Sequence, residues 1–190
     1  PSASDLLRDL ALDFGGACTT PARPGIDVRG AGGLFVSAAI RGTTSYAIRS
    51  GVDSAEGRTE VLNSIIQSCE GAAVASGRAL TLTNVQVLGC TTRSGALLDA
   101  FGTDAMELRS VLLAANRAGG EAAALVRGAL GAAEGISFIA NATESGIPLL
   151  ITPSLVPRWE ILDGVLTVRA NRLLGGTWAR NVVVNDMDEA

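Results

Sequence analysis

The chain has 190 residues and a formal net charge of −4, and 47% of it is hydrophobic although it contains only four Phe, two Trp and one Tyr. It has no Lys and no His, which excludes a Ser-His-Asp triad, a Cys-His pair, a phosphate-loop lysine and most zinc sites. The fifteen Arg residues are scattered and no apolar run approaches about 20 residues, so we expect neither nucleic-acid binding nor a membrane-spanning segment.

The N-terminal segment fits two patterns. Ser4 can cap a short amphipathic helix that uses Leu6 and Leu7, whereas the alternation of Leu10, Leu12 and Phe14 is that of a strand. In either form, we expect residues 1–30 to cover the open end of the repeats that follow. Residues 33–36 and 45–48 predict the first strands of a repetitive region that extends over residues 31–184.

A short phrase then recurs five times along the chain. It consists of two positions two residues apart, usually both apolar, followed three residues later by Cys or Asn. The copies are Ser64-x-Ile66-x-x-Cys69, Val85-x-Val87-x-x-Cys90, Val111-x-Leu113-x-x-Asn116, Ile136-x-Phe138-x-x-Asn141 and Leu166-x-Val168-x-x-Asn171. Successive markers lie 21, 26, 25 and 30 residues apart, which is the period of a solenoid.

Each phrase alternates with period two, so it predicts a short strand with one buried face that ends in a turn. Parallel stacking of these strands would place one residue of each coil in a continuous core ladder. That ladder consists of Ile66, Val87, Leu113, Phe138 and Val168.

The marker residues suit a turn, because Asn tolerates the left-handed conformation and stacked Asn side chains can hydrogen-bond from coil to coil. We therefore expect a turn ladder at Asn116, Asn141 and Asn171. Cys69 and Cys90 hold the same position in adjacent coils, where they form either a disulfide or a pair of stacked buried thiols.

Two solenoid folds share this phrase, and the residues after the marker separate them. A leucine-rich repeat needs Leu two residues later, but only Leu173 satisfies this condition. Most copies instead have a Gly and then an apolar run, such as residues 95–98 and 146–151. We therefore predict a single all-β domain over residues 1–190, a right-handed parallel β-helix of about six to seven coils, with a leucine-rich-repeat solenoid as the alternative.

Three segments carry a family resemblance. The segments from Phe138 to Gly146 and from Leu113 to Gly120 resemble the F-x-x-N and G-G-A/I repeats of polymorphic outer-membrane-protein and adhesin-like β-helices. The segment from Leu80 to Cys90 is similar to coils of the pectin-lyase-like superfamily. The resemblance spans about residues 60–175, and it implies a secreted or surface-displayed protein without catalytic activity.

Carboxylates and Arg are the groups left for catalysis, as in β-helix glycosidases and lyases. Such a site needs acids of adjacent coils on one outer face, but counting forward from the markers sets Asp99 against Leu125 and Leu150. Asp104 falls against Leu130 and Leu155 in the same way. We therefore predict no catalytic residue, no metal site and no cofactor.

Two further features are open to more than one interpretation. Asn141-Ala142-Thr143 is an N-glycosylation sequon, although Asn141 also belongs to the turn ladder. Trp159 and Trp178, each close to an Arg, predict either a sugar-stacking platform or a cover for the edge of the core.

From these features we expect a structural or interaction module, a section of a larger surface-exposed or multi-subunit assembly. Its solenoid faces or ends would bind other protein chains. The alternative is a tailspike-like or lyase-like β-helix that binds or cleaves glycans. An extracellular or cell-surface location is what the resemblance implies, and the acidic tail, residues 185–190, is expected to be solvated.

Overall fold

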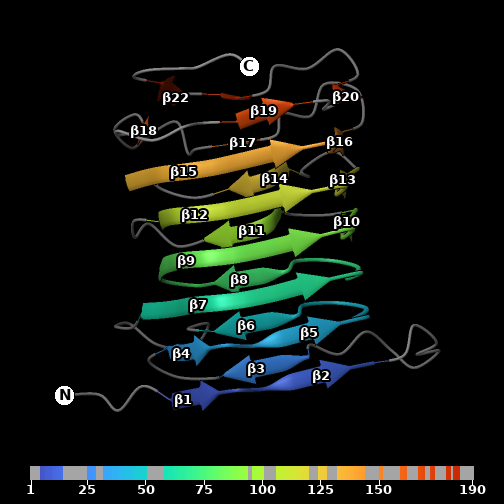
Figure 1. The fold of residues 1–190 in the computed structure, drawn as a ribbon, viewed down its shortest axis with the longest axis vertical. Coiled ribbons are helices and arrows are strands. Elements are labelled where there is room, and N and C mark those ends of the chain that lie inside the picture. The colour runs from blue at the N-terminus through green and yellow to red at the C-terminus, as the bar shows by residue number, and fades with distance from the viewer. Residues whose placement is uncertain are drawn as a thin grey trace.

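The structure is a computed structural model that describes residues 5–14, 25–28, 32–50, 58–93, 96–100, 106–119, 124–127 and 132–143, with short strands between 150 and 184. The described residues form β-strands and no helices, and all strand pairs are parallel. The strands wind into a solenoid with three sides (Figure 1). The leucine-rich-repeat alternative, in which strands occupy one side only, is thereby ruled out.

The largest side is an 11-stranded sheet, the front sheet. It contains β1 (Asp5–Arg8), β2 (Ala11–Asp13), β4 (Gly33–Val36), β5 (Ala39–Arg41), β7 (Arg58–Gln67), β9 (Ala79–Leu88), β12 (Met106–Ala114), β15 (Ala132–Ile139), β18 (Trp159–Ile161), β19 (Thr167–Arg169) and β22 (Val182–Val184).

The other two sides are narrower. The four-stranded side sheet contains β10 (Thr91–Thr92), β13 (Arg117–Ala118), β16 (Ala142–Thr143) and β20 (Arg172–Leu173). The seven-stranded back sheet contains β3 (Ile26–Val28), β6 (Ile48–Ser50), β8 (Val74–Ser76), β11 (Ala96–Ala100), β14 (Ala124–Arg127), β17 (Leu150–Ile151) and β21 (Ala179–Arg180).

The coil is right-handed. In Figure 1 the near strands β7, β9 and β12 run from left to right, and the far strands β8 and β11 return from right to left as the chain rises from its N-terminus. The fold class predicted from the sequence, a right-handed parallel β-helix, is therefore confirmed.

The number of turns differs from the expectation. The structure supports about four turns, not six to seven. Among the residues described before β7, none forms a strand of the side sheet, whose described pairing begins with the bridge between Glu70 and Thr91. Beyond β17 the long front strand is replaced by the short strands β18 and β19. The sequence-based number of coils is larger because it also counts these partial coils.

The N-terminal segment is part of the solenoid. Of residues 1–30, for which the sequence predicts a cap, the strands β1, β2 and β3 pair with β4, β5 and β6 as further members of the front and back sheets. The alternation of Leu10, Leu12 and Phe14 is thus the informative pattern, and the helical alternative for this segment is wrong.

Two bends with left-handed backbone divide each coil of the front sheet. The first lies at Asp9, Ser37, Asn63, Asn84, Ser110 and Gly135, with φ between 49° and 61°, and the second at Gly42, Ser68, Gly89, Ala115 and Ala140, with φ between 52° and 75°. The two bends are five residues apart in every coil from Ser37 onward, although the coils differ in length. The recurring phrase in the sequence is this constant segment.

The interior is filled by apolar residues that stack in register. Ile66, Val87, Leu113 and Phe138 form one line of strand partners, which Ile40 extends toward the N-terminus and Val168 toward the C-terminus. Ile66, Val87, Leu113 and Phe138 are at most 1% exposed. Burying such side chains contributes roughly 1.5–3 kcal/mol each, so the column stabilises the fold along its whole length.

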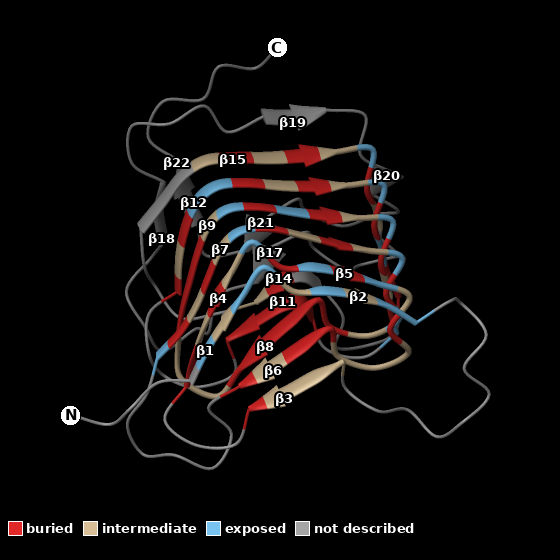
Figure 2. Cartoon of the chain, turned by 60° about the horizontal axis from the view of Figure 1, so that its bottom comes forward, coloured by how far each residue is buried: buried red, intermediate tan, exposed pale blue. Residues whose placement is uncertain are grey.

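Figure 2 shows how burial is distributed over the three sheets. On the front strands buried residues alternate with half-buried or exposed ones, as expected for a sheet with one face in the core. In β8 and β11 every residue is buried. These two strands of the back sheet therefore lack the period-two pattern that makes the front sheet visible in the sequence.

Candidate functional site

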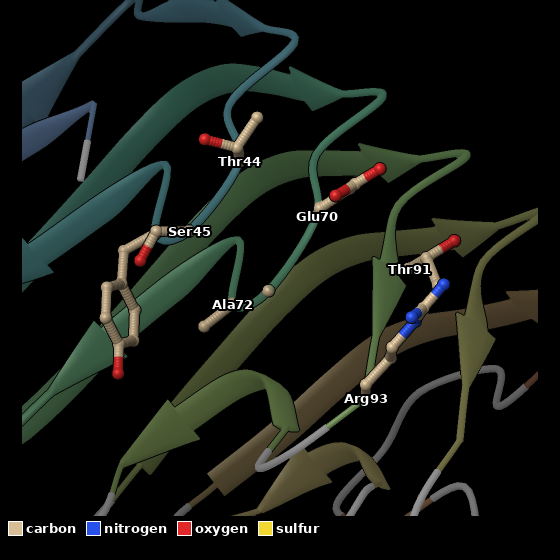
Figure 3. A pocket seen from close by; sticks show the side chains of 8 residues that line it. Thr44, Ser45, Glu70, Ala72, Thr91 and Arg93 are labelled. Carbon is tan, nitrogen blue, oxygen red and sulfur yellow. The ribbon is translucent and has the colours of Figure 1, made fainter. Parts of the chain in front are cut away.

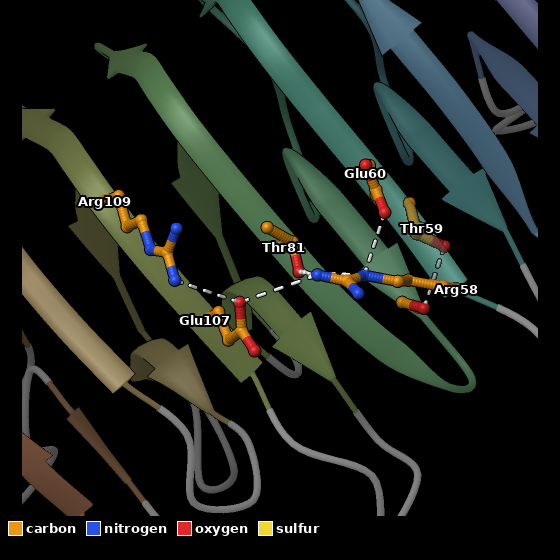
Figure 4. A network of polar contacts seen from close by, with 7 residues as sticks. Arg58, Thr59, Glu60, Thr81, Glu107 and Arg109 are labelled. Carbon is orange, nitrogen blue, oxygen red and sulfur yellow. Dashed lines mark hydrogen bonds and ion pairs between the residues drawn. The ribbon is translucent and has the colours of Figure 1, made fainter.

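The acidic residues that adjacent coils bring together on the front sheet form one polar network. Glu60, Thr81 and Glu107 are register partners in β7, β9 and β12. Arg58 lies across Thr81, with its Nε 3.0 Å from Oε1 of Glu60 and Nη2 3.5 Å from Oε2 of Glu107. Its guanidinium also donates to Oγ1 of Thr81 at 2.8 Å, and Arg109 approaches Glu107 at 3.7 Å (Figure 4).

This network is an ion-pair cluster on an open face. The side chains of Arg58 and Glu60 are 50% and 36% exposed, so water screens their attraction. Each carboxylate faces a guanidinium and not a second carboxylate. A pair of acids working as proton donor and nucleophile needs a substrate between them, whereas Arg58 already occupies that space.

The sequence did not predict this network, because a count forward from the markers does not bring these three residues into register. Glu60, Thr81 and Glu107 each lie nine residues before their marker, where the coil has constant length. Counting backward would have aligned them. Loops of variable length follow the marker, so the forward count loses the register.

Asp99 lies on the back sheet, away from this network. It is 7% exposed, and Arg127, its register partner in β14, binds it with Nε to Oδ1 at 2.9 Å and Nη2 to Oδ2 at 2.5 Å. Asp99 and Glu107 therefore do not share a site. Asp104, the other acid considered from the sequence, lies outside the described residues.

A pocket of about 460 Å³ opens at the N-terminal edge of the side sheet. Its lining is mostly polar, with Glu70, Thr91 and Arg93 from two neighbouring coils (Figure 3). Thr44, Ser45 and Tyr46 come from the preceding coil, and Arg49 lies 5.3 Å from the centre of the Tyr46 ring. These groups suit a small polar ligand. No sequence pattern predicted the pocket, because its residues belong to the corners of three different coils.

The corner between the front and side sheets holds the four described marker residues, Cys69, Cys90, Asn116 and Asn141, all of them buried. Asn116 accepts a hydrogen bond from the N–H of Cys90 at 2.9 Å and donates from Nδ2 to the carbonyl of Val87 at 2.9 Å. Asn141 repeats the arrangement with the N–H of Asn116 at 3.0 Å and the carbonyl of Leu113 at 2.8 Å. Each Asn thus clamps the corner of the preceding coil.

Cys69 and Cys90 occupy the same position and form a disulfide, with Cα atoms 4.5 Å apart. The N–H of Cys69 points to Sγ of Cys90 at 3.2 Å, so the sulfur stands where the Asn side chains place their oxygen. The left-handed residue is not the marker but its predecessor, for example Ala115 before Asn116. The marker is conformationally ordinary, and its role is hydrogen bonding.

The glycosylation sequon falls on this ladder. Asn141 is 1% exposed and its Nδ2 is engaged with Leu113, so the amide is inaccessible to a glycosyltransferase in the folded chain. Asn171 and Trp178 lie outside the described residues, as does the side chain of Trp159. Within the described part of the chain, no group of His, Cys, Asp and Glu is arranged to hold a metal, and no helix is long and apolar enough to span a membrane.

Three comparisons with known proteins identified no relative of this chain. No protein-family model matches the sequence, and no curated protein or solved structure shows significant similarity to it. The class of the protein, a parallel β-solenoid, therefore rests on its strand pairing.

Proposed function

We propose that this solenoid is a non-catalytic structural module that binds other protein chains through its faces or ends. The observation that carries the proposal is the pairing of its acids. Glu60 and Glu107 are bridged by Arg58, and Asp99 is held by Arg127. Stacked coils have thus brought acids together in arrangements that stabilise the fold instead of leaving a carboxylate pair open to a substrate.

The proposal extends to location. The repeats resemble those of polymorphic outer-membrane-protein and adhesin-like β-helices of the pectin-lyase-like superfamily, which favours a secreted or surface-displayed section of a larger assembly. The disulfide between Cys69 and Cys90 is consistent with this location, because disulfides persist in oxidising compartments and are rare in the cytosol.

Photo-crosslinking in the native host tests the proposal. A photoreactive amino acid is placed in turn at Leu6 on the first coil, Gln86 on the front sheet and Glu70 on the side sheet, all exposed positions. We expect protein adducts, identified by mass spectrometry, from at least one position. Absence of adducts at all three, together with cleavage of a polysaccharide by the purified chain, would refute the proposal.

A second candidate function is glycan binding in the pocket of the side sheet. It is favoured by the mixture of hydroxyl groups, a carboxylate, a guanidinium and an aromatic ring in the lining. Titration calorimetry against neutral and acidic oligosaccharides tests it. We expect any binding to weaken at least about tenfold in Arg93→Ala; no binding by the unaltered chain would exclude this candidate.

A further inference from the structure

The first coil leaves the apolar interior open at the N-terminal end. Leu7, Leu12 and Ile26, one from each of β1, β2 and β3, point into the core but are only partly buried. The two exposed large apolar side chains of the described residues, Leu6 at 55% and Phe14 at 38%, lie on the same coil. Apolar surface of this kind at an end of a solenoid marks an interaction site.

The strands of this coil also carry free edges. Among the described strands, β1, β2 and β3 each pair on one side only, with β4, β5 and β6. At the other end of the solenoid, β19 and β21 pair on one side only, with β15 and β17. Such edges pair readily with another chain, and here all strands of both ends run parallel.

The two ends complement each other in charge. One register line begins at Asp13 and passes through Arg41, Gln67, Leu88, Ala114 and Ile139 to end at Arg169. A second line begins at Asp27 and passes through Arg49, Ala75, Asp99, Arg127 and Ile151 to end at Arg180. Both lines thus have Asp at the N-terminal end and Arg at the C-terminal end.

The apolar lines match in the same way. The core line that starts at Leu12 ends at Val168, and the line that starts at Ile26 ends at Ala179. Within the chain, an Asp and an Arg of adjacent coils on one of these lines already form an ion pair, Asp99 with Arg127. Stacking one end on the other would again place an Asp and an Arg on adjacent coils of the same line, in the reverse order along the solenoid.

One strand stands in the way of that stacking. β22 pairs with β18 and so extends the front sheet one turn beyond β19 and β21. A second copy placed with Asp13 over Arg169 and Asp27 over Arg180 would bring its β1 to the position that β22 holds. Docking of the second copy therefore requires β22 to leave β18.

We propose that two copies of this chain associate head to tail, with the first coil of one copy seated on β19 and β21 of the other and its β1 replacing β22 on β18. This inference rests on the proposed function and names its partner as a second copy. β22 then acts as an internal cap that limits association. Because such a contact is heterologous and stacks the copies along the solenoid axis, it does not close into a ring, and association should continue into longer rods.

Sedimentation velocity of the full chain over a range of concentrations tests the proposal. We expect species that grow with concentration and shrink with added salt. Asp13→Arg should weaken association by roughly tenfold, and the double variant with Arg169→Asp should recover it. Val183→Pro, which disrupts β22, should strengthen association. The matched control, Glu70→Arg on the side sheet, makes the same charge change away from both ends and should have no effect.

Two outcomes would overturn the inference. One is a chain that stays monomeric at every concentration, with Val183→Pro monomeric as well. The other is association that Asp13→Arg does not weaken. If Leu6 nevertheless gives crosslinks to a different protein in the host, the proposed function stands and the end surface belongs to that partner.

Discussion

The amide oxygen of Asn116 accepts a hydrogen bond from the backbone N–H of Cys90 at 2.9 Å. This contact joins two devices that secure the same corner of successive coils. On one side of it Cys90 is covalently linked to Cys69, and on the other Asn116 donates a hydrogen bond from Nδ2 to Oδ1 of Asn141 at 3.0 Å. The corner is thus held continuously from the coil of β7 to the coil of β15.

Asn116→Ala should destabilise the fold by about 2–4 kcal/mol. The substitution leaves the buried N–H of Cys90 and the carbonyl of Val87 without their side-chain partner, and each such group costs roughly 1–3 kcal/mol. Urea unfolding followed by circular dichroism measures the change. Asn84→Ala, which removes an exposed hydrogen bond to Asn63, is the matched control and should cost less than about 1 kcal/mol.

Removing the disulfide should cost about 3 kcal/mol, since the bridge closes a loop of 21 residues. The double variant Cys69→Ala with Cys90→Ala measures this loss. Pairing Cys69→Ala with Cys90→Asn should recover part of it, because an amide at this position can accept from the N–H of residue 69 as Asn116 does from Cys90. Equal stability of the two double variants would show that the corner does not use its amides in this way.

Two glycines in left-handed backbone should respond differently to substitution by Ala. A Cβ added at Gly71 would collide with the carbonyl oxygen of Ser45, whereas one added at Gly89 meets no atom within 4 Å. Gly89→Ala should therefore cost only the conformational penalty of about 1–2 kcal/mol. Gly71→Ala should cost more than about 3 kcal/mol, or prevent folding. Similar thermal midpoints for the two variants would contradict the described packing of coils at this corner.

The Asp99–Arg127 ion pair should contribute more to the free energy of unfolding than the network around Arg58. Arg127→Ala leaves the carboxylate of Asp99, with its side chain 10% exposed, without its guanidinium and should cost about 2 kcal/mol. Arg58→Ala breaks more contacts, but on a half-exposed face, and should cost at most about 1 kcal/mol. Guanidinium chloride is unsuitable here because it screens charge, so unfolding in urea is the appropriate measurement.

The fold could be predicted from the sequence because one part of each coil has constant length. Between bends such as Ser110 and Ala115 the chain places two inward residues, and the buried marker follows directly after the second bend. The bends themselves gave no signal, since Ser, Ala and Asn hold the left-handed conformation at more of these positions than Gly does. The back sheet was predicted only as a second strand after a Gly, because strands such as β8 and β11 are buried on both faces and show no alternation.

The candidate site was much less predictable. The network around Arg58 depends on which outward residues become register partners, and that register is lost across loops of unequal length. The pocket depends on three corners, with Tyr46, Glu70 and Arg93 lying in different coils. Neither arrangement leaves a local pattern, so strand pairing is needed to find them.

The fold and the proposed end-to-end association both require that equivalent residues of successive coils stack in one line. Spin labels at Asp9 and Ser110, exposed first-bend positions four coil steps apart, test it by double electron–electron resonance, with Cys18→Ser to remove the third thiol. At about 4.8 Å per coil, the backbone sites should lie about 19 Å apart despite the length of chain between them. A narrow distribution near that value would support the stacked register. A broad distribution, or one centred beyond about 30 Å, would contradict it.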